Sequence, residues 1–190
     1  MALCQCPILA GMQEGDFCVI DIETASGSMQ NIPSGFRLLL TGARWGQAYG
    51  MYTSAPESLG QLADLLEGFA GPVVTYNGAR FDLPVLDRHF QETLGRPLVV
   101  RRHYDLMVEI ERAAERRISL DRLCLYTFGE QKVSWDHRQN AQVWAEAPQR
   151  LVDYNRVDLD LTHELFMRVL RGEPLFLGDA TVVLPLPEEV

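Results

Sequence analysis

Residues 16–23 read DFCVIDIE. The middle of this stretch is apolar and rich in β-branched residues, as in a strand that lies in the centre of a sheet and is covered on both faces. The stretch ends in two acids, Asp21 and Glu23, whose side chains point to the same face because they are two residues apart in a strand. We therefore expect a buried central strand that carries a pair of carboxylates at its end.

The pattern around this strand predicts an α/β fold. Two further strands are expected at residues 36–45 and 47–53, joined tightly at Gly46 as a hairpin. After them, helices and strands alternate: a helix at 56–70, a strand at 73–77, a helix at 81–94 and a strand at 97–105. This order predicts a mixed five-stranded sheet, with the first three strands antiparallel and helices on both faces.

Helices are also expected in the last third of the chain. Asp105 is expected to cap a helix that continues to about Arg117, and Ser119 is expected to cap a helix over 119–128. Residues 129–139 are interpreted as an irregular, exposed crossing, and a long helix is expected at 148–171.

Length and composition predict one domain in the 190 residues. We expect an N-terminal extension at 1–14, a domain at 15–171 and a proline-broken tail at 172–190 that lies outside the main pattern. The sequence contains no apolar window long enough to span a membrane, and its first residues do not show the basic and then apolar pattern of a secretory signal. We therefore expect a cytoplasmic protein without membrane contact. Cys4 and Cys6 alone are too few ligands for a closed zinc site, and reduced thiols are the simplest interpretation.

The net charge of −9 argues against bulk electrostatic binding of long nucleic acid, but not against a grip on a few nucleotides. Sixteen of the seventeen basic residues are arginines, and seven of these lie between Arg96 and Arg122. Two interpretations stay open for this stretch. It is either an arginine-lined path for a strand or a solvated helix face with interleaved glutamates.

Two further motifs carry acids. The first, at residues 77–84, reads NGARFDLP and places Asp82 at the start of a helix, where an anion is favoured with or without a function. The second pairs Tyr154 with Asp158 on one face of the last helix, because residues four apart share a face. Each motif alone also fits an ordinary structural role.

Together, these motifs resemble the DEDD superfamily of 3′–5′ exonucleases, which has an RNase H-like fold. Asp21-x-Glu23 is similar to the first motif of the superfamily. Asn77-x₃-Phe81-Asp82-x-Pro84 is similar to the second motif as family-B DNA polymerase proofreading domains have it, and Tyr154-x₃-Asp158 to the third. The resemblance covers residues 16–171 and includes the stand-alone relatives of those proofreading domains.

The third motif favours the Tyr-containing branch of the superfamily. The His-containing branch places a histidine five residues before the last acid, where this chain has Asp153, and His163 lies on the other side of Asp158. Asp105 resembles an acid found after the fifth strand in related nucleases, so a metal contact is an alternative to its role as a helix cap.

The resemblance implies a two-metal-ion mechanism with Mg²⁺ or Mn²⁺. It implies that Asp21 bridges two ions, that Glu23 and Asp158 share the ion that holds the attacking water, and that Asp82 serves the ion at the leaving oxygen. Tyr154 would orient the water. Thr24, Asn77 and Phe81 would shape the pocket for the 3′-terminal nucleotide of single-stranded DNA or RNA, which would leave as a nucleoside 5′-monophosphate.

Two alternatives remain beside this hypothesis. One is a non-catalytic RNase H-like module that binds nucleic acid or a protein, although such a module has no reason to keep a repulsive acidic cluster. The other is an enzyme that cleaves small nucleotides. The polymerase domain that accompanies the module in family-B polymerases is not seen in these residues, so substrate delivery by the chain itself or by an unassigned protein partner is expected.

Overall fold

The computed structural model describes residues 12–25, 32–129 and 135–187. Its main sheet has the strand order β3-β2-β1-β4-β5. The strands are β1 (Cys18–Ala25), β2 (Arg37–Trp45), β3 (Ala48–Thr53), β4 (Val73–Thr75) and β5 (His103–Asp105). β1 is central, antiparallel to β2 and parallel to β4, while β3 and β5 form the two edges. The predicted mixed five-stranded sheet is confirmed.

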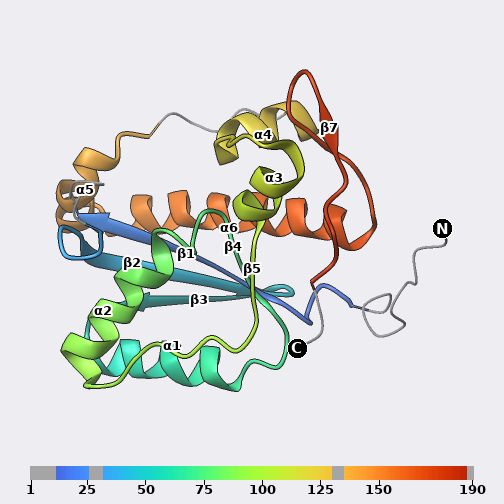
Figure 1. Ribbon diagram of the computed structural model, residues 1–190. Coiled ribbons are helices and arrows are strands. Elements are labelled where there is room, and N and C mark those ends of the chain that lie inside the picture. The colour runs from blue at the N-terminus through green and yellow to red at the C-terminus, as the bar shows by residue number, and fades with distance from the viewer. Residues whose placement is uncertain (1–11, 26–31, 130–134, 188–190) are drawn as a thin grey trace.

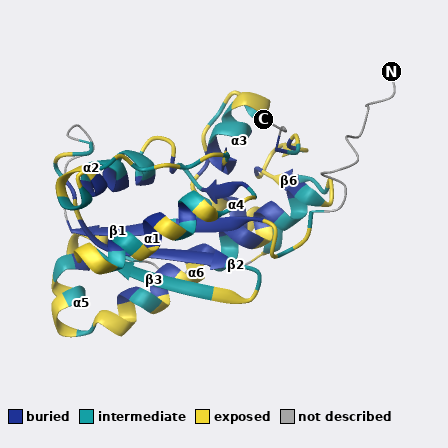
Figure 2. Ribbon diagram, turned by 90° about the horizontal axis from the view of Figure 1, so that it is seen from below, coloured by how far each residue is buried: buried dark blue, intermediate teal, exposed yellow. Residues whose placement is uncertain are grey.

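Two layers of helices cover the sheet (Figure 1). Helices α1 (Pro56–Gly68) and α2 (Asp82–Leu94) lie on one face. On the other face lie α3 (Leu106–Ala114), α4 (Leu120–Phe128) and the long α6 (Pro148–Leu170), with α5 (Asn140–Glu146) packed against the beginning of α6 and the end of β1. Figure 2 shows β1 and β2 buried between these layers, with exposed residues on the outer sides of the helices.

The alternation of side chains along β1 divides the hydrophobic core in two. Cys18, Ile20 and Ile22 pack with α1 and α2, whereas Phe17 and Val19 pack with α3, α4 and α6. Successive side chains of a strand point to opposite faces, so Asp21 and Glu23 continue the face of Val19. The two acids of β1 therefore lie under α6, the helix that carries Tyr154 and Asp158.

Two predicted elements differ from the structure, and one helix of the structure was not predicted. The strand expected at 97–105 is limited to His103–Asp105, because Leu98 donates its N–H to the Asp87 carboxylate (2.9 Å) and not to a strand. The helix expected to reach Arg117 ends at Ala114, since Glu115 adopts a left-handed conformation with φ 54°. Helix α5 was not predicted, and residues 130–134 of the expected crossing lie outside the described residues.

The described part of the C-terminal segment packs on the domain. Residues 175–182 form a hairpin of β6 (Leu175–Phe176) and β7 (Thr181–Val182). Leu175, Leu177 and Leu184 are buried in the core beside α6. The apolar residues of this segment therefore complete one core, although its prolines suggested an unpatterned tail.

Among the described helices, none combines the length and apolar content that a bilayer span requires. Cys18 and Cys124 are buried and form no disulfide within the described residues, and Cys4 and Cys6 lie outside that part of the chain.

Candidate active site

The end of β1 and the middle of α6 bring three carboxylates together. Oxygen atoms of Asp21, Glu23 and Asp158 all lie within 4.8 Å of one another. Glu23 and Asp158 are buried, and Asp21 is partly exposed. Like charges at this distance disfavour their joint ionisation unless a cation or hydrogen-bond donors compensate. The first and third sequence motifs therefore meet in one acidic cluster.

Tyr154 lies one helical turn before Asp158 and faces the same cavity. Its ring stacks on Trp135, with centroids 4.4 Å apart, and meets the edge of His137. Burial raises the pKa of the Tyr154 phenol far above its usual range, and the charges of Asp158, Glu23 and Asp21 raise it further. The hydroxyl therefore stays protonated at neutral pH, so it can act as a hydrogen-bond donor.

Asp82 reaches the site from the other face of the sheet, as the first residue of α2. Its Oδ1 accepts a hydrogen bond from the Ile22 backbone N–H (3.1 Å), between the two acids of β1. Burial raises the pKa of Asp82 to about 7; Asp105 and Asp158 add to this rise, and the backbone N–H donors oppose it. Asp82 lines the same cavity but does not belong to the group of three carboxylates within 4.8 Å.

These acids surround one cavity of about 460 Å³, which we call the site cavity. Its lining residues are Asp21, Ile22, Glu23, Thr24, Phe36, Tyr76, Asn77, Phe81, Asp82, Met107, Ser119, Leu120, Asp121, His137, Asn140, Tyr154 and Asp158. All eight residues to which the resemblance gives a role in catalysis, metal binding or substrate binding are among them. Three separated motifs therefore share one space.

Asn77 and Phe81 lie at opposite ends of the loop between β4 and α2. Asn77 has a left-handed backbone (φ 67°), which asparagine tolerates better than most residues. Its Oδ1 accepts a hydrogen bond from Arg117 (2.7 Å). Phe81 packs edge-on against Phe36, with centroids 4.9 Å apart. This loop therefore presents an amide and an aromatic ring to the cavity, and Thr24 of β1 also lines the cavity.

Asp105 has a structural role beside the site. It caps α3 through the N–H groups of Met107 and Val108, as predicted. Its carboxylate also accepts hydrogen bonds from the N–H groups of Asn77 (2.8 Å) and Ala79 (2.9 Å). Asp105 is not among the lining residues of the site cavity. Asp105 therefore fixes the loop that leads to Asp82, and its own carboxylate oxygens are bonded to backbone N–H groups.

Two buried asparagines hold the acids of β1 and were missed in the sequence. Asn155 Nδ2 donates to Asp21 Oδ2 (2.7 Å), and Asn140 Nδ2 donates to Glu23 Oε2 (2.9 Å). The Asn140 amide oxygen accepts in turn from Trp135 Nε1 (2.7 Å). Asn155 could have been found from the sequence, because it lies directly after Tyr154 within the third motif. Asn140 follows a stretch without periodicity, and no sequence feature points to it.

Gly42 makes room for the Asn155 side chain. It pairs with Asp21 across β1 and β2, and a Cβ atom at this position would lie 1.8 Å from Asn155 Oδ1. A side chain at residue 42 would therefore displace Asn155 from Asp21. His137 also lines the cavity, with Nδ1 4.0 Å from Glu23 Oε2, and was likewise not singled out in the sequence.

The acidic cluster fits a hard divalent cation. Its donors are carboxylate oxygens, which Mg²⁺ and Mn²⁺ prefer, and they converge although their charges repel. The asparagine donors on Asp21 and Glu23 fix the direction of these carboxylates, as outer-shell hydrogen bonds do in metal sites. Asp21, Glu23 and Asp158 are the residues that would hold an ion, with Asp82 on the opposite wall.

Comparisons with known proteins agree with this architecture. Residues 51–170, more than half of the chain, match the family model described as RNase_H superfamily. The fold is similar to the structure of the family B DNA polymerase from the hyperthermophilic archaeon Pyrobaculum calidifontis, with a TM-score of 0.64 and 19% sequence identity. The match covers 81% of this chain but 24% of the polymerase chain, and it shows a common fold. No curated protein sequence matches the chain.

Proposed function

The chain belongs to the RNase H superfamily, and from this premise we propose that it is a metal-dependent 3′–5′ exonuclease of the Tyr-containing DEDD branch. The proposed substrate is the 3′ end of single-stranded DNA or RNA, and the proposed product is a nucleoside 5′-monophosphate. One observation carries the proposal. Oxygens of Asp21, Glu23 and Asp158 lie within 4.8 Å of one another in a cavity that also contains Asp82 and Tyr154.

In this proposal, Asp21, Glu23, Asp82 and Asp158 hold two divalent cations, Mg²⁺ or Mn²⁺. Bound ions of this kind activate a water and stabilise both oxygens of an in-line displacement at phosphorus. Asn155 and Asn140 keep Asp21 and Glu23 in place through their amide donors. The protein thus contributes fixed geometry and negative charge, and no side chain of the cavity needs to act as a covalent nucleophile.

Tyr154 positions the attacking water by donating or accepting a hydrogen bond. Its raised pKa supports this role, because a protonated phenol is not a general base at neutral pH. Its stacking on Trp135 holds the ring in place. A metal contact by Tyr154 is not required, so its hydroxyl contributes to the rate and not to ion binding.

The cavity volume and lining support a terminal nucleotide as the occupant. A volume of about 460 Å³ lies in the range of small-molecule sites. Phe81 offers a ring for a base, Asn77 offers an amide for hydrogen bonds, and Thr24 lies beside the acids of β1. The same features would serve a small nucleotide, so the length of the substrate must be varied in the experiment.

The cost of burying these acids without a compensating cation favours catalysis over passive binding. A buried carboxyl group whose pKa rises to about 7 destabilises the metal-free protein at neutral pH. A module that only binds nucleic acid gains nothing from three converging carboxylates with Asp82 in the same cavity, because these acids repel phosphates.

The test uses matched 5′-labelled single strands of DNA and RNA with Mg²⁺ or Mn²⁺, and with EDTA. We expect stepwise shortening from the 3′ end with metal and intact strands in EDTA. Undiminished cleavage in EDTA would exclude the metal mechanism. Cleavage of a circular single strand would show an endonuclease, and cleavage of dinucleotides alone would show an enzyme for small substrates.

The matched control is Asp153→Asn. Asp153 is an exposed acid of α6 that bonds Gln149 and lies outside the site cavity. This variant should cleave like the wild type. If neither strand is shortened by the wild type under any metal condition, while the protein is folded, the proposed activity is wrong.

A further inference from the structure

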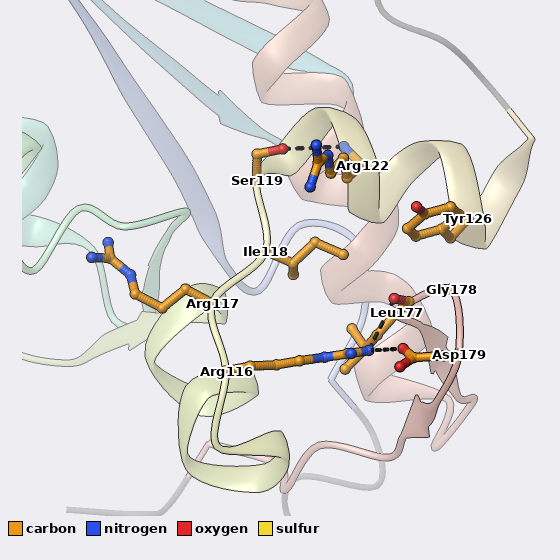
Figure 3. Close-up of a pocket in the computed structure, with 9 residues that line it drawn as sticks. All are labelled: Arg116, Arg117, Ile118, Ser119, Arg122, Tyr126, Leu177, Gly178 and Asp179. Atoms are coloured by element: carbon orange, nitrogen blue, oxygen red, sulfur yellow. Dashed lines mark hydrogen bonds and ion pairs between the residues drawn. The ribbon is translucent and has the colours of Figure 1, made fainter.

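A second cavity, of about 820 Å³, lies between α3, α4 and the C-terminal hairpin (Figure 3). Three arginines line it, at positions 116, 117 and 122, together with Ile118, Ser119, Tyr126 and the hairpin residues 177–179. We call this cavity the arginine groove. It collects positive charge on a chain whose net charge is −9.

The three arginines differ in their partners. Arg116 reaches the hairpin, where it bonds the Asp179 carboxylate (2.6 Å) and the Leu177 carbonyl (2.9 Å). Arg117 and Arg122 are exposed, and within the described part of the chain neither forms an ion pair. Arg116 therefore holds the wall of the groove, while no carboxylate of the described residues neutralises the charges of Arg117 and Arg122.

The arginine groove adjoins the site cavity. Ser119 lines both. Arg117 donates to Asn77 Oδ1 (2.7 Å) and contacts Met107 Sδ (3.1 Å), and both of these residues line the site cavity. In Figure 3, Arg117 points away from the hairpin that Arg116 contacts. Positive charge therefore lies beside the wall of the acidic site, at Arg117, and farther along the groove, at Arg122.

Tyr126 adds an aromatic surface to the groove. Tyr126 is 46% exposed, although it is a large residue on a helix that packs on the core. The hairpin approaches this ring at Gly178, where φ is 97° and an added Cβ would lie 3.0 Å from Tyr126 Cε2. Exposed aromatic rings beside guanidinium groups are the combination with which proteins stack bases and bind phosphates of single strands.

We propose that the arginine groove binds the backbone of the single-stranded nucleic acid whose 3′ end occupies the site cavity. This inference rests on the proposed function, since the strand in the groove is the substrate of the acidic site. Arg117 and Arg122 contact phosphates of nucleotides upstream of the terminal one, and Tyr126 stacks on a base. Guanidinium groups suit this task because they match phosphate oxygens with paired donors.

Binding is measured without catalysis, by the fluorescence anisotropy of labelled oligothymidylate and oligouridylate in EDTA. Arg122→Glu should weaken binding of these strands about tenfold or more at low salt, because it removes a phosphate contact and adds a repulsive charge. Arg122→Lys should retain part of the affinity. The matched control is Arg150→Glu, at an exposed arginine of the first turn of α6 that does not line the groove.

Turnover supplies the second measurement, with a long strand and a dinucleotide compared in Mn²⁺. Arg122→Glu should raise the KM for the long strand about tenfold and leave the dinucleotide kcat/KM unchanged, because a dinucleotide ends before it reaches the groove. Melting temperatures of all variants, measured by circular dichroism, should stay close to the wild-type value, since Arg122 is exposed.

The outcomes separate this inference from the proposed function. If the wild type cleaves strands and Arg122→Glu binds and cleaves them like Arg150→Glu, the groove proposal is wrong and the exonuclease proposal stands. If strands bind in an Arg122-dependent way but are never cleaved, the groove holds and the proposed activity fails. If a mononucleotide binds with the same dependence on Arg122 and the same affinity as a strand, the occupant is a free nucleotide and the groove proposal fails.

Discussion

The site cavity and the arginine groove are neighbours with opposite charge, and they are built differently. The site cavity gathers acids from β1, α2 and α6, which are distant in sequence and mostly buried. The groove uses a nearly continuous stretch, residues 116–126, with exposed arginines, and closes it with the hairpin. Charges in a buried site act with little screening, whereas exposed charges are weakened by water and salt. Removal of an acid from the cavity should therefore have a much larger effect than a change in the groove.

The largest effect is expected for Asp21→Asn. It should lower the exonuclease rate about a thousandfold or more, because bound metal contributes several kcal/mol of transition-state stabilisation. The same change removes one of the repelling charges, so in EDTA the variant should melt at the wild-type temperature or higher. Millimolar Mn²⁺ should raise the wild-type melting temperature by mass action and raise that of the variant much less.

Thermal melts of both proteins, with EDTA and with Mn²⁺, test this prediction. A variant that melts well below the wild type in EDTA, or gains as much from Mn²⁺, would identify Asp21 as a structural acid. Asp153→Asn should match the wild type in every arm.

The next largest effect concerns the pH dependence of stability through Asp82. Its pKa is about 7 in the folded protein and 3.8 ordinarily, so the native state binds more protons than the unfolded state between these values. The contribution of Asp82 to the free energy of unfolding therefore falls as pH rises through this window, by up to about 4 kcal/mol. Denaturant unfolding in EDTA, from about pH 4 to about pH 7, should show this loss in the wild type and not in Asp82→Asn. Parallel curves for the two proteins would contradict the prediction.

Tyr154→Phe should lower the rate about a hundredfold, since a group that positions a reacting water contributes on this scale. Metal affinity, measured by calorimetry with Mn²⁺, should stay close to wild type because the ring and its stacking on Trp135 are kept. Tyr49→Phe is the matched control, because the Tyr49 hydroxyl bonds Asp160 and lies outside the cavity. Loss of Mn²⁺ binding in Tyr154→Phe would show that the phenol has a different role.

A smaller effect is expected at the two asparagines. Asn155→Ala and Asn140→Ala each remove the donor that orients one carboxylate, and each should weaken Mn²⁺ binding about tenfold. Gln149→Ala, at an exposed residue of α6, should leave the affinity unchanged. If the asparagine variants lose stability but bind Mn²⁺ like the wild type, their role is in packing and not in the orientation of Asp21 and Glu23.

The smallest expected effect is the salt dependence of strand binding in the groove, which should differ from the salt dependence of cleavage in the site cavity. If Arg117 and Arg122 each contact one phosphate, strand affinity should fall about sevenfold between about 50 mM and about 200 mM salt. Turnover of a dinucleotide should change much less over this range, since its chemistry takes place in the buried site. Equal salt dependence for both substrates would mean that the groove does not distinguish them.

The sequence predicted most of the fold because its periodic elements are locally encoded. The strand at 16–23 and the last helix are buried against one sheet, and the pattern of apolar residues in both segments indicates this burial. Shorter elements were less predictable. Leu98 and Val100 are apolar because they pack against the core formed with α1 and α2, not because they belong to β5. Burial of an apolar residue therefore did not imply strand pairing.

The candidate site was predictable to the extent that its acids lie in motifs of fixed spacing. Asp21 and Glu23 are two apart on a strand, and Tyr154 and Asp158 are four apart on a helix, so each pair shares a face by local geometry alone. The residues that support these acids follow no such rule. Asn140 and Asn155 are defined by contacts over more than a hundred residues of chain, to Glu23 and Asp21.

The sequence by itself thus determined the sheet, most of the helices, and which site residues of one strand or one helix share a face. The tertiary structure alone decided how the elements meet. Helix α6 passes close enough to Gly42 for Asn155 to reach Asp21. Asp82 bonds Ile22 from the opposite face of the sheet, and the hairpin approaches Tyr126 at Gly178. The reason is physical. Spacing within a strand or helix fixes direction over a few residues, whereas distances between elements depend on how whole faces pack against one another.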